Sequence, residues 1–225
     1  IDALCSRPTT TAAQWAWPAE TGEWEDYPRF AHRLFEVMAG SANPLQERIY
    51  WFLTGVLVVA GTDFVQFAEQ KEHVNRLRAW PGRTYKALLA DVLGTGPMQE
   101  YLNGIFSEPP HPNENLARET LELFSLGVSH PTTGAPNYSE ADVKEVSRAL
   151  TGYRYDWDTR AVWFDAAYWD NGPKTFLGAA RGAAKLAEVV DAVAAHDAFR
   201  YFVPRQLYRH LVGLEPSAAT LQSLA

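Results

Sequence analysis

The amino-acid sequence predicts a mainly α-helical fold. Signals that start and stop helices recur along the chain, and apolar residues repeat at helical spacing rather than in the alternation typical of strands. The longest apolar run covers residues 49–60 and is shorter than the roughly 20 residues of a membrane-spanning helix, so it predicts a buried helix and no membrane span. We therefore expect a single multi-helix domain over residues 28–225, with long irregular aromatic-rich loops and at most a small hairpin. Residues 1–27 are expected to form an irregular N-terminal segment.

The first half of the chain carries clear helix punctuation. Pro28 opens a helix that Gly40 ends. Asn43 and Pro44 supply an N-cap and a first-turn proline for a helix over residues 45–60, because a proline at the first helical position loses no hydrogen bond. Further helices are expected to start at Asp63, at Thr84 or Arg83, and at Pro97.

The second half repeats this pattern. Ser139 followed three residues later by Asp142 resembles a capping box, and the helix that it starts should end at Gly152. A later helix covers residues 183–195. The helix after it contains Pro204, which should kink or divide it because proline lacks the backbone donor and clashes with the preceding turn.

Three stretches are predicted to be irregular. Residues 105–113 and 129–138 are rich in proline, glycine and hydroxyl residues. Residues 153–178 are aromatic, with a turn at Asp170–Pro173, and residues 153–164 are compatible with a small hairpin. The sequence does not decide whether the aromatic side chains of this stretch are buried or exposed. Four of its side chains either fill a core or form a stacking platform for sugar rings: Trp157, Trp163, Tyr168 and Trp169.

The charge balance excludes some classes of partner. The 27 acidic and 20 basic residues give a formal net charge of −7, which argues against a surface for nucleic acid or an anionic membrane. The single cysteine, Cys5, excludes an internal disulfide framework and a cysteine-rich zinc site. No phosphate-binding loop, dinucleotide fingerprint or haem motif is present, so the sequence identifies no cofactor.

Residues 111–127 are the strongest candidate for a functional site. Their apolar side chains, including Leu123, spread over one arc of a helix, and a narrow polar stripe lies opposite. We define this polar stripe as Asn115, Arg118, Glu119 and Glu122. Second-rank candidates for ligand binding are Asn113, Glu114 and Asp170.

The polar stripe has two functional interpretations and one structural interpretation. Glu119 and Glu122, one turn apart, suit a metal ion as hard oxygen ligands. Alternatively, one of them acts as a general base while Arg118 orients an anionic group of the substrate. The structural interpretation is an ordinary surface helix, with Asn113 or Asn115 as its N-cap and Arg118 paired to Glu122.

Histidine and arginine candidates elsewhere are weaker. His130 has no partner at metal-binding spacing, and the His196-Asp197 pair is expected to cap a helix. The arginines at positions 200, 205 and 209 are expected to form a solvated face that pairs with acidic neighbours.

A long motif in the middle of the chain resembles the bacterial family known as domain of unknown function 1800. The family motif is Asn-Glu-Asn, two variable residues, Arg-Glu and a Glu-Leu-Phe-x-Leu-Gly ending, followed by Tyr-Thr/Ser-Glu-x-Asp-Val and Ala-Leu-Thr-Gly-aromatic. The matching residues are Asn113, Glu114, Asn115, Arg118, Glu119, Glu122, Leu123, Phe124, Leu126, Gly127, Tyr138, Glu140, Asp142, Val143, Ala149, Leu150, Thr151 and Gly152. The resemblance extends over about residues 30–212.

The resemblance implies a fold, a site location and a periplasmic or extracellular setting, but no particular reaction. Two departures matter. Trp169-Asp170 stands where relatives usually carry a His-Asp pair, which removes a possible ligand or proton carrier, and the loop 129–137 is longer than usual.

Two functions therefore remain open. The first is a secreted enzyme or ligand-binding domain, for example for metal-assisted hydrolysis, that acts on a polar small molecule, polymer or carbohydrate. The second is a non-catalytic assembly module in which the motif residues form a buried polar network. A protein partner, or further segments of a longer protein, would then cover part of the surface.

Overall fold

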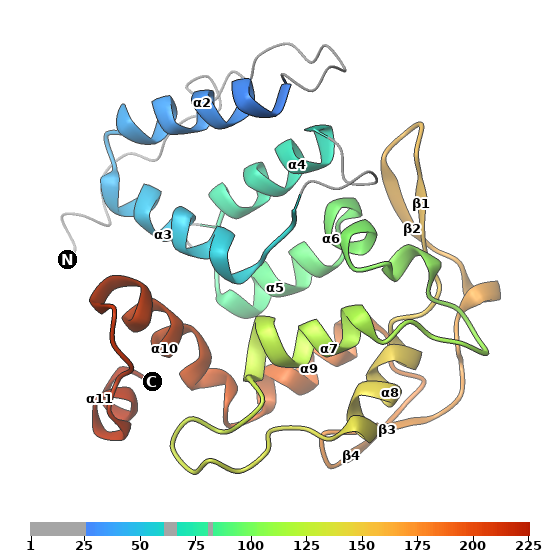
Figure 1. Cartoon of the computed structure of the whole chain (residues 1–225). Helices are drawn as coiled ribbons and strands as arrows, with labels where there is room; N and C mark the ends of the chain where they lie inside the picture. The colour runs from blue at the N-terminus through green and yellow to red at the C-terminus, as the bar shows by residue number, and fades with distance from the viewer. Residues whose placement is uncertain (1–25, 61–66, 81–82) are drawn as a thin grey trace. The chain divides into compact units, whose positions relative to one another are not determined.

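The computed structural model describes residues 26–60, 67–80 and 83–225 (Figure 1). Within these ranges the chain forms ten α-helices and two small two-stranded sheets, which confirms the predicted mainly α-helical class. The chain divides into two compact units, Ile1–Pro81 and Gly82–Ala225. The expected division into residues 1–27 and 28–225 stays a prediction, and most of the first segment lies outside the described residues. No helix in the described ranges has the length and apolarity that a bilayer crossing requires.

The first unit contains three described helices: α2 (Asp26–Ala39), α3 (Pro44–Val56) and α4 (Phe67–Arg78). The side-chain Oδ1 of Asn43 accepts from the backbone N of Gln46 at 3.1 Å, which confirms the predicted N-cap of α3. This helix ends at Val56, before the predicted end at residue 60. The start expected at Asp63 lies outside the described residues.

Polar side chains are buried where α3 and α4 meet. The Arg78 guanidinium donates to Glu47 at 2.6 Å, and both side chains are buried. His73 on α4 donates from Nε2 to the carbonyl oxygen of Leu57 at 2.7 Å, since only a protonated ring nitrogen can bond a carbonyl. Burial lowers the pKa of His73 to about 4, so the ring is neutral at physiological pH.

The second unit carries the remaining helices. The side chain of Thr84 caps the first of them by accepting from the backbone N of Ala87 at 3.2 Å, as predicted. The predicted capping box of Ser139 and Asp142 is present in full. The elements are α5 (Tyr85–Leu93), α6 (Gly96–Tyr101), the 3-10 turn η2 (Gly104–Phe106), α7 (Asn115–Leu121), the π-helical turn η3 (Glu122–Leu126), α8 (Glu140–Ala149), α9 (Leu186–Ala195), α10 (Phe199–Val212) and α11 (Ala218–Leu224).

The core of this unit is apolar and forms between its helices. Helix α5 packs on α9, and α7 packs on α8. Leu88, Leu89, Leu116 and Leu121 are fully buried in these contacts. Helix α10 continues through Pro204 as one element, so the proline does not divide the helix, and the alternative of a kink stays a prediction.

Two hairpins follow α8. Strands β1 (Tyr153–Asp156) and β2 (Ala161–Phe164) pair antiparallel, which confirms the hairpin expected there. A second hairpin, β3 (Lys174–Phe176) with β4 (Ala179–Gly182), was not predicted, because strands this short carry too few residues to show alternation. The 3-10 turn η4 (Ala166–Tyr168) lies between the hairpins in sequence.

Candidate functional site

The backbone changes from α-helix to π-helix inside the polar stripe. Helix α7 ends at Leu121, and η3 begins at Glu122, so the N–H of Gly127 bonds the carbonyl of Glu122, five residues back, at 3.0 Å. The hydroxyl of Ser125 donates in the same way to the carbonyl of Thr120. Single π-helical turns are rare and often occur at functional sites.

Side chains from elsewhere in the unit satisfy the carbonyls at the end of this turn. The Tyr85 hydroxyl on α5 donates to the carbonyl of Phe124 at 2.7 Å. The side-chain amide of Asn137 donates to the carbonyls of Leu126 and Gly127, both at 2.9 Å. The π-turn is therefore tied both to α5 and to the loop that precedes α8.

The π-turn explains why one apolar prediction is wrong. A regular helix places Leu123 on the apolar arc of residues 111–127, but its side chain is 52% exposed. Phe124 and Leu126 are buried as expected. The wider turn rotates the side chains away from the regular spacing of about 100° per residue, so Leu123 faces solvent.

Arg118 joins α7 to α8. Its two terminal nitrogens bond the two carboxylate oxygens of Glu140 at 2.8 Å each, and one of them lies 3.3 Å from Glu114. The hydrogen bonds that Arg118 donates to Glu140 hold the pKa of Arg118 above its ordinary value, and the same bonds lower the pKa of Glu140. The predicted pair of Arg118 with Glu122 is wrong, because helical side chains tilt toward the N-terminus and bring this guanidinium to Glu114 and Glu140.

The two glutamates of the polar stripe have different environments. Glu122 accepts a hydrogen bond from the Tyr138 hydroxyl at 2.7 Å. Glu119 is half-buried, and within the described ranges no residue donates a hydrogen bond to its carboxylate. Burial, followed by the negative charge of Glu122, raises the pKa of Glu119. The neutral form of Glu119 is therefore favoured relative to an ordinary glutamate.

Asn113 and Asn115 shape the start of α7. The Asn113 Oδ1 accepts from the backbone N of Asn115 at 2.8 Å, and the backbone N of Asn113 donates to Ser107 at 3.0 Å. Asn113 thus satisfies one free N–H of the first turn, which is the work of a cap. The side chain of Asn115 is exposed. Asn113 and Glu114 thus immediately precede Asn115, the first residue of the polar stripe.

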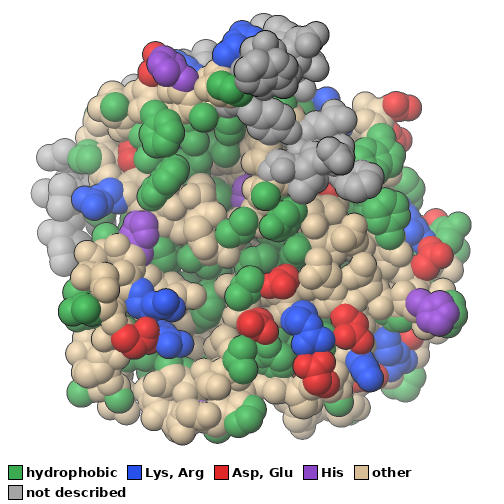
Figure 2. All heavy atoms as spheres, in the orientation of Figure 1, with side chains coloured by type: hydrophobic (Ala, Val, Ile, Leu, Met, Phe, Trp, Pro, Cys, Tyr) green, Lys and Arg blue, Asp and Glu red, His purple; other side chains and the backbone are tan. Residues whose placement is uncertain are grey.

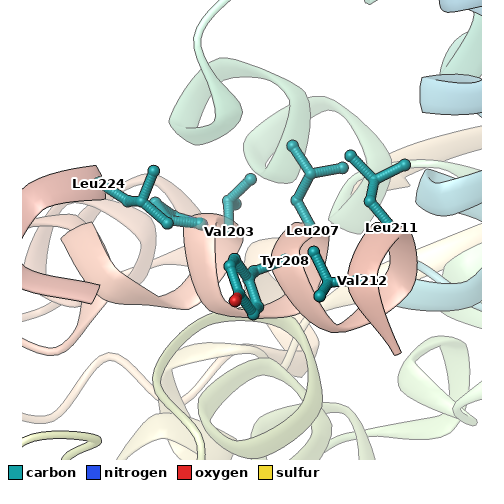
Figure 3. Close-up of a pocket in the computed structure, with 7 residues that line it drawn as sticks. Val203, Leu207, Tyr208, Leu211, Val212 and Leu224 are labelled. Carbon is teal, nitrogen blue, oxygen red and sulfur yellow. The ribbon is translucent and has the colours of Figure 1, made fainter. Parts of the chain in front are cut away.

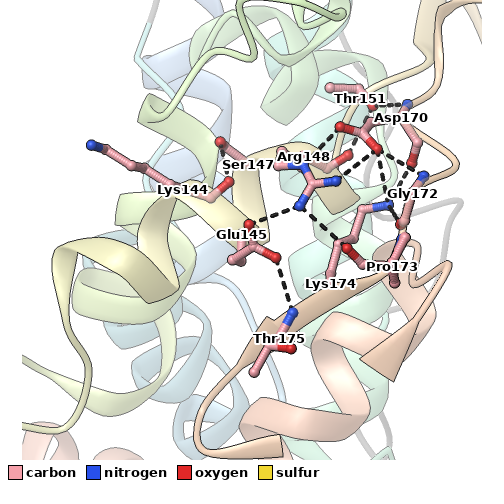
Figure 4. Close-up of polar contacts among 10 residues, drawn as sticks. All are labelled: Lys144, Glu145, Ser147, Arg148, Thr151, Asp170, Gly172, Pro173, Lys174 and Thr175. Atoms are coloured by element: carbon pink, nitrogen blue, oxygen red, sulfur yellow. Dashed lines mark hydrogen bonds and ion pairs between the residues drawn. The ribbon is translucent and has the colours of Figure 1, made fainter. Parts of the chain in front are cut away.

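Asp170 belongs to a second cluster (Figure 4). Its two carboxylate oxygens accept from Arg148 on α8 at 2.7 and 3.1 Å, and these bonds lower the pKa of Asp170. The buried ammonium of Lys174 donates to the carbonyls of Asp170 and Gly172. In the described part of the chain, no hydrogen bond or ion pair joins Asp170 to the polar stripe. Asp170 therefore interacts with Arg148 and Lys174 rather than with the other candidates.

His130 has a partner that sequence reasoning missed. Its Nε2 lies 2.9 Å from a carboxylate oxygen of Asp197, and its Nδ1 accepts from the backbone N of Thr132 at 3.3 Å. Because Nδ1 is an acceptor, the proton of the neutral ring is on Nε2 and points to Asp197. No local pattern predicts this contact, since 67 residues separate the two side chains. It fastens the loop after η3 to the junction of α9 and α10.

Tyr138 and Glu140 are the other residues that the prediction left out of the site. Both are contained in the family motif, so the motif was the one signal that pointed to them. Figure 2 shows acidic and basic side chains interleaved on the visible face, without a large patch of one sign among the described residues.

An apolar pocket of about 320 Å³ lies on α10 and α11 (Figure 3). It contains no residue of the polar stripe, and its lining is almost entirely apolar. Its lining consists of Val203, Pro204, Leu207, Tyr208, Leu211, Val212 and Leu224. No ionisable acid or base of catalytic type other than the Tyr208 phenol lines it, so it offers little for acid–base chemistry.

Comparisons with known proteins give a family. A family model described as "Protein of unknown function (DUF1800)" matches residues 3–225. No curated protein and no solved structure matches the chain. Across the described ranges, no three histidine, cysteine, aspartate or glutamate side chains gather closely enough to hold a metal ion.

Proposed function

We propose that this chain, which belongs to the DUF1800 family of proteins of unknown function, binds a polar polymer or sugar at the polar stripe of α7 and hydrolyses it there. The observation that carries the proposal is the unequal environment of two carboxylates one turn apart. Glu122 is held by the Tyr138 hydroxyl at 2.7 Å, whereas burial raises the pKa of Glu119. Pairs of carboxylates whose environments separate their pKa values supply the acid and the base of hydrolytic enzymes.

Each glutamate then has a role. Glu119, as the acid, gives its proton to the leaving oxygen of the bond that breaks. Glu122, as the base, takes a proton from the attacking water, and its carboxylate is oriented by Tyr138. The water oxygen bonds the carbon whose bond to the leaving oxygen breaks. The two products together therefore contain the atoms of the substrate and of one water, and the protons balance. Arg118 is a positioning residue, because Glu140 already occupies its guanidinium.

A second candidate function is that of a structural module. It is favoured by the cluster of Arg148, Asp170 and Lys174, in which the charged groups are paired to each other or to backbone carbonyls. Fully satisfied polar networks of this kind fix one arrangement of the elements they join. The same description fits Arg118 and Glu140, which join α7 to α8.

The substitution Glu119→Gln separates the two functions. If Glu119 is the acid, this variant should lose turnover of polysaccharides or glycosides by about 10²-fold or more, while its melting temperature stays close to that of the unchanged protein. The exposed Glu36 on α2 offers the control Glu36→Gln, which should alter neither quantity. A large loss of stability, with no hydrolysis by the unchanged protein on any substrate tried, would overturn the enzyme proposal in favour of the structural module.

We also propose an exported setting, periplasmic or extracellular, for this activity. The family resemblance supports it, and a polymeric substrate would be met outside the cell. Fractionation of cells that produce the protein tests this setting.

A further inference from the structure

The outer face of the hairpin β1–β2 presents aromatic rings to solvent. Arg154 on β1 lies directly opposite Trp163 on β2, so the two side chains share one face of the hairpin. The neighbouring Tyr155 is buried on the other face. Trp163 is 47% exposed, and Tyr168, in the η4 turn after β2, is 44% exposed. Two exposed rings therefore flank the exposed end of this hairpin, one on β2 and one in the turn that follows it.

Arg154 fixes the arrangement of this face. Its guanidinium carbon lies 3.8 Å from the centroid of the Tyr168 ring, which is a close stacking contact. One terminal nitrogen donates to the carbonyl of Ile105 at 2.9 Å, and the other is paired with Glu108. Three contacts therefore fix the position of the Arg154 guanidinium, and one of them also fixes the position of the Tyr168 ring.

Hydrogen-bonding groups thus adjoin both exposed rings, because Arg154 is the cross-strand partner of Trp163 and stacks on Tyr168. The Glu108 side chain is 46% exposed, so its carboxylate can accept hydrogen bonds from a ligand. The Arg154–Glu108 pair is neutral as a unit. We define the hairpin face as Trp163, Arg154, Glu108 and Tyr168.

We propose that the hairpin face binds a neutral glycan chain. A sugar ring offers a C–H face that packs on an aromatic ring and a rim of hydroxyls that bond a carboxylate or guanidinium, and the hairpin face provides both kinds of group side by side. The charge distribution favours a neutral ligand over a polyanion, because the charges of Arg154 and Glu108 offset each other and the chain carries a net charge of −7. A protein interface would instead place few charges at its centre.

This proposal stands independently of hydrolysis at α7. The hairpin face contains none of the residues of the polar stripe, so it should still bind glycan in the Glu119→Gln variant. If hydrolysis fails but glycan binding persists, the hairpin face is a binding surface without the proposed enzyme. If hydrolysis is found and the hairpin variants bind normally, only the present proposal is overturned.

The test measures binding of the full chain to four insoluble or soluble neutral polysaccharides: cellulose, chitin, starch and xylan. We expect retention on at least one of them, weakened about tenfold or more by Trp163→Ala and by Tyr168→Ala, since loss of a stacking ring removes the main apolar contact. Trp163→Phe, which keeps a smaller ring, should retain part of the binding. Trp51→Ala, at an exposed tryptophan on α3, is the matched control and should bind normally.

Several results would overturn the proposal. They are the absence of binding to all four polysaccharides, equal binding by Trp163→Ala and the unchanged protein, or binding to heparin alone. A dimer detected by analytical ultracentrifugation and abolished by Trp163→Ala would show instead that a second copy of the chain covers the hairpin face. Circular dichroism of each variant confirms that the fold is retained, and Glu108→Gln, which removes a charge but no ring, checks the polar contribution independently.

Discussion

The charge state of His73 is set by burial. Its Nε2 donates to the carbonyl of Leu57, and its pKa lies at about 4 rather than at the ordinary 6.5. The unfolded chain therefore binds a proton below pH 6.5 that the folded chain does not bind until about pH 4. We expect stability to fall as the pH decreases through this window, by up to about 3 kcal/mol from this one group. Urea unfolding at a series of pH values measures the slope.

Two variants isolate the contribution of this histidine. His73→Gln retains a donor for the carbonyl of Leu57 but does not titrate, so its stability should depend less on pH between 6.5 and 5, where few carboxylates change charge. His32→Gln, at an exposed histidine of α2, should leave the slope unchanged. Identical slopes for His73→Gln and the unchanged protein would show that His73 does not carry the effect.

Contacts of single residues were predictable only where they are local. Asn43 and Ser139 cap the helices that follow them, and a pattern of three or four residues was enough to find both. Arg118 and Glu140 are 22 residues apart, and His130 and Asp197 are 67 apart. Such pairs depend on how the helices pack, which spacing along one helix cannot show.

At the scale of elements, Arg148 is the connection between α8 and the segment that leads into β3. It bonds Asp170 through two nitrogens, and its remaining nitrogen contacts Glu145 at 2.8 Å and the carbonyl of Pro173 at 3.3 Å. We expect Arg148→Gln to destabilise the protein by about 1.5–3 kcal/mol, the usual effect of losing hydrogen bonds to a charged group. Chemical denaturation at pH 7 measures the loss.

The pH dependence of this variant is a second readout. The bonds from Arg148 lower the pKa of Asp170, so the stability they give is present above the unfolded pKa of about 3.9 and is lost as the pH falls through the folded pKa. The difference between Arg148→Gln and the unchanged protein should therefore shrink in acid. Arg209→Gln, at an exposed ion pair 3.3 Å from Glu215, should cost less than about 0.5 kcal/mol. An equal cost for the two variants would contradict the role given to Arg148.

Elements with strong local signals were predicted and weakly patterned ones were not. The helices α5 and α8 begin where Thr84 and Ser139 predicted. The turn η3 was missed because a π-helix does not follow the period on which helix prediction rests. Strand β3 was missed because it has three residues, and the burial of its Lys174 follows from nearby carbonyls rather than from any apolar pattern.

At the scale of the whole molecule, the second unit contains every hydrogen bond described for the polar stripe. Its helices pack on one another, and a chain of roughly 150 residues buries about 70% of its unfolded surface. We expect a fragment of residues 82–225 to fold alone, with a helical circular dichroism spectrum and a cooperative thermal transition. A fragment with the spectrum of an unfolded chain would show that the second unit depends on the first.

The overall class followed from composition and punctuation, whereas the site geometry did not. Helix starts and stops were enough for a mainly α-helical fold, and the helical periodicity of residues 111–127 placed the polar stripe opposite an apolar arc. The inequality of Glu119 and Glu122 depends on Tyr138, which reaches Glu122 through a loop whose path no sequence rule describes. The sequence favoured a core or loop-anchoring use of the aromatic residues over a stacking platform, and the 47% exposure of Trp163 shows that this ring does not fill a core.

The π-turn determines the direction in which the chain leaves α7. Residues 122–126 hold one residue more than a regular turn would, and the chain then exits at Gly127 and returns through Tyr138 and Glu140 to contact α7. Removing a single residue from this turn would rotate the exit by about 100° and carry the returning segment away from its partners. The geometry of the site thus depends on the number of backbone units in the turn, independently of which side chains those units carry to solvent.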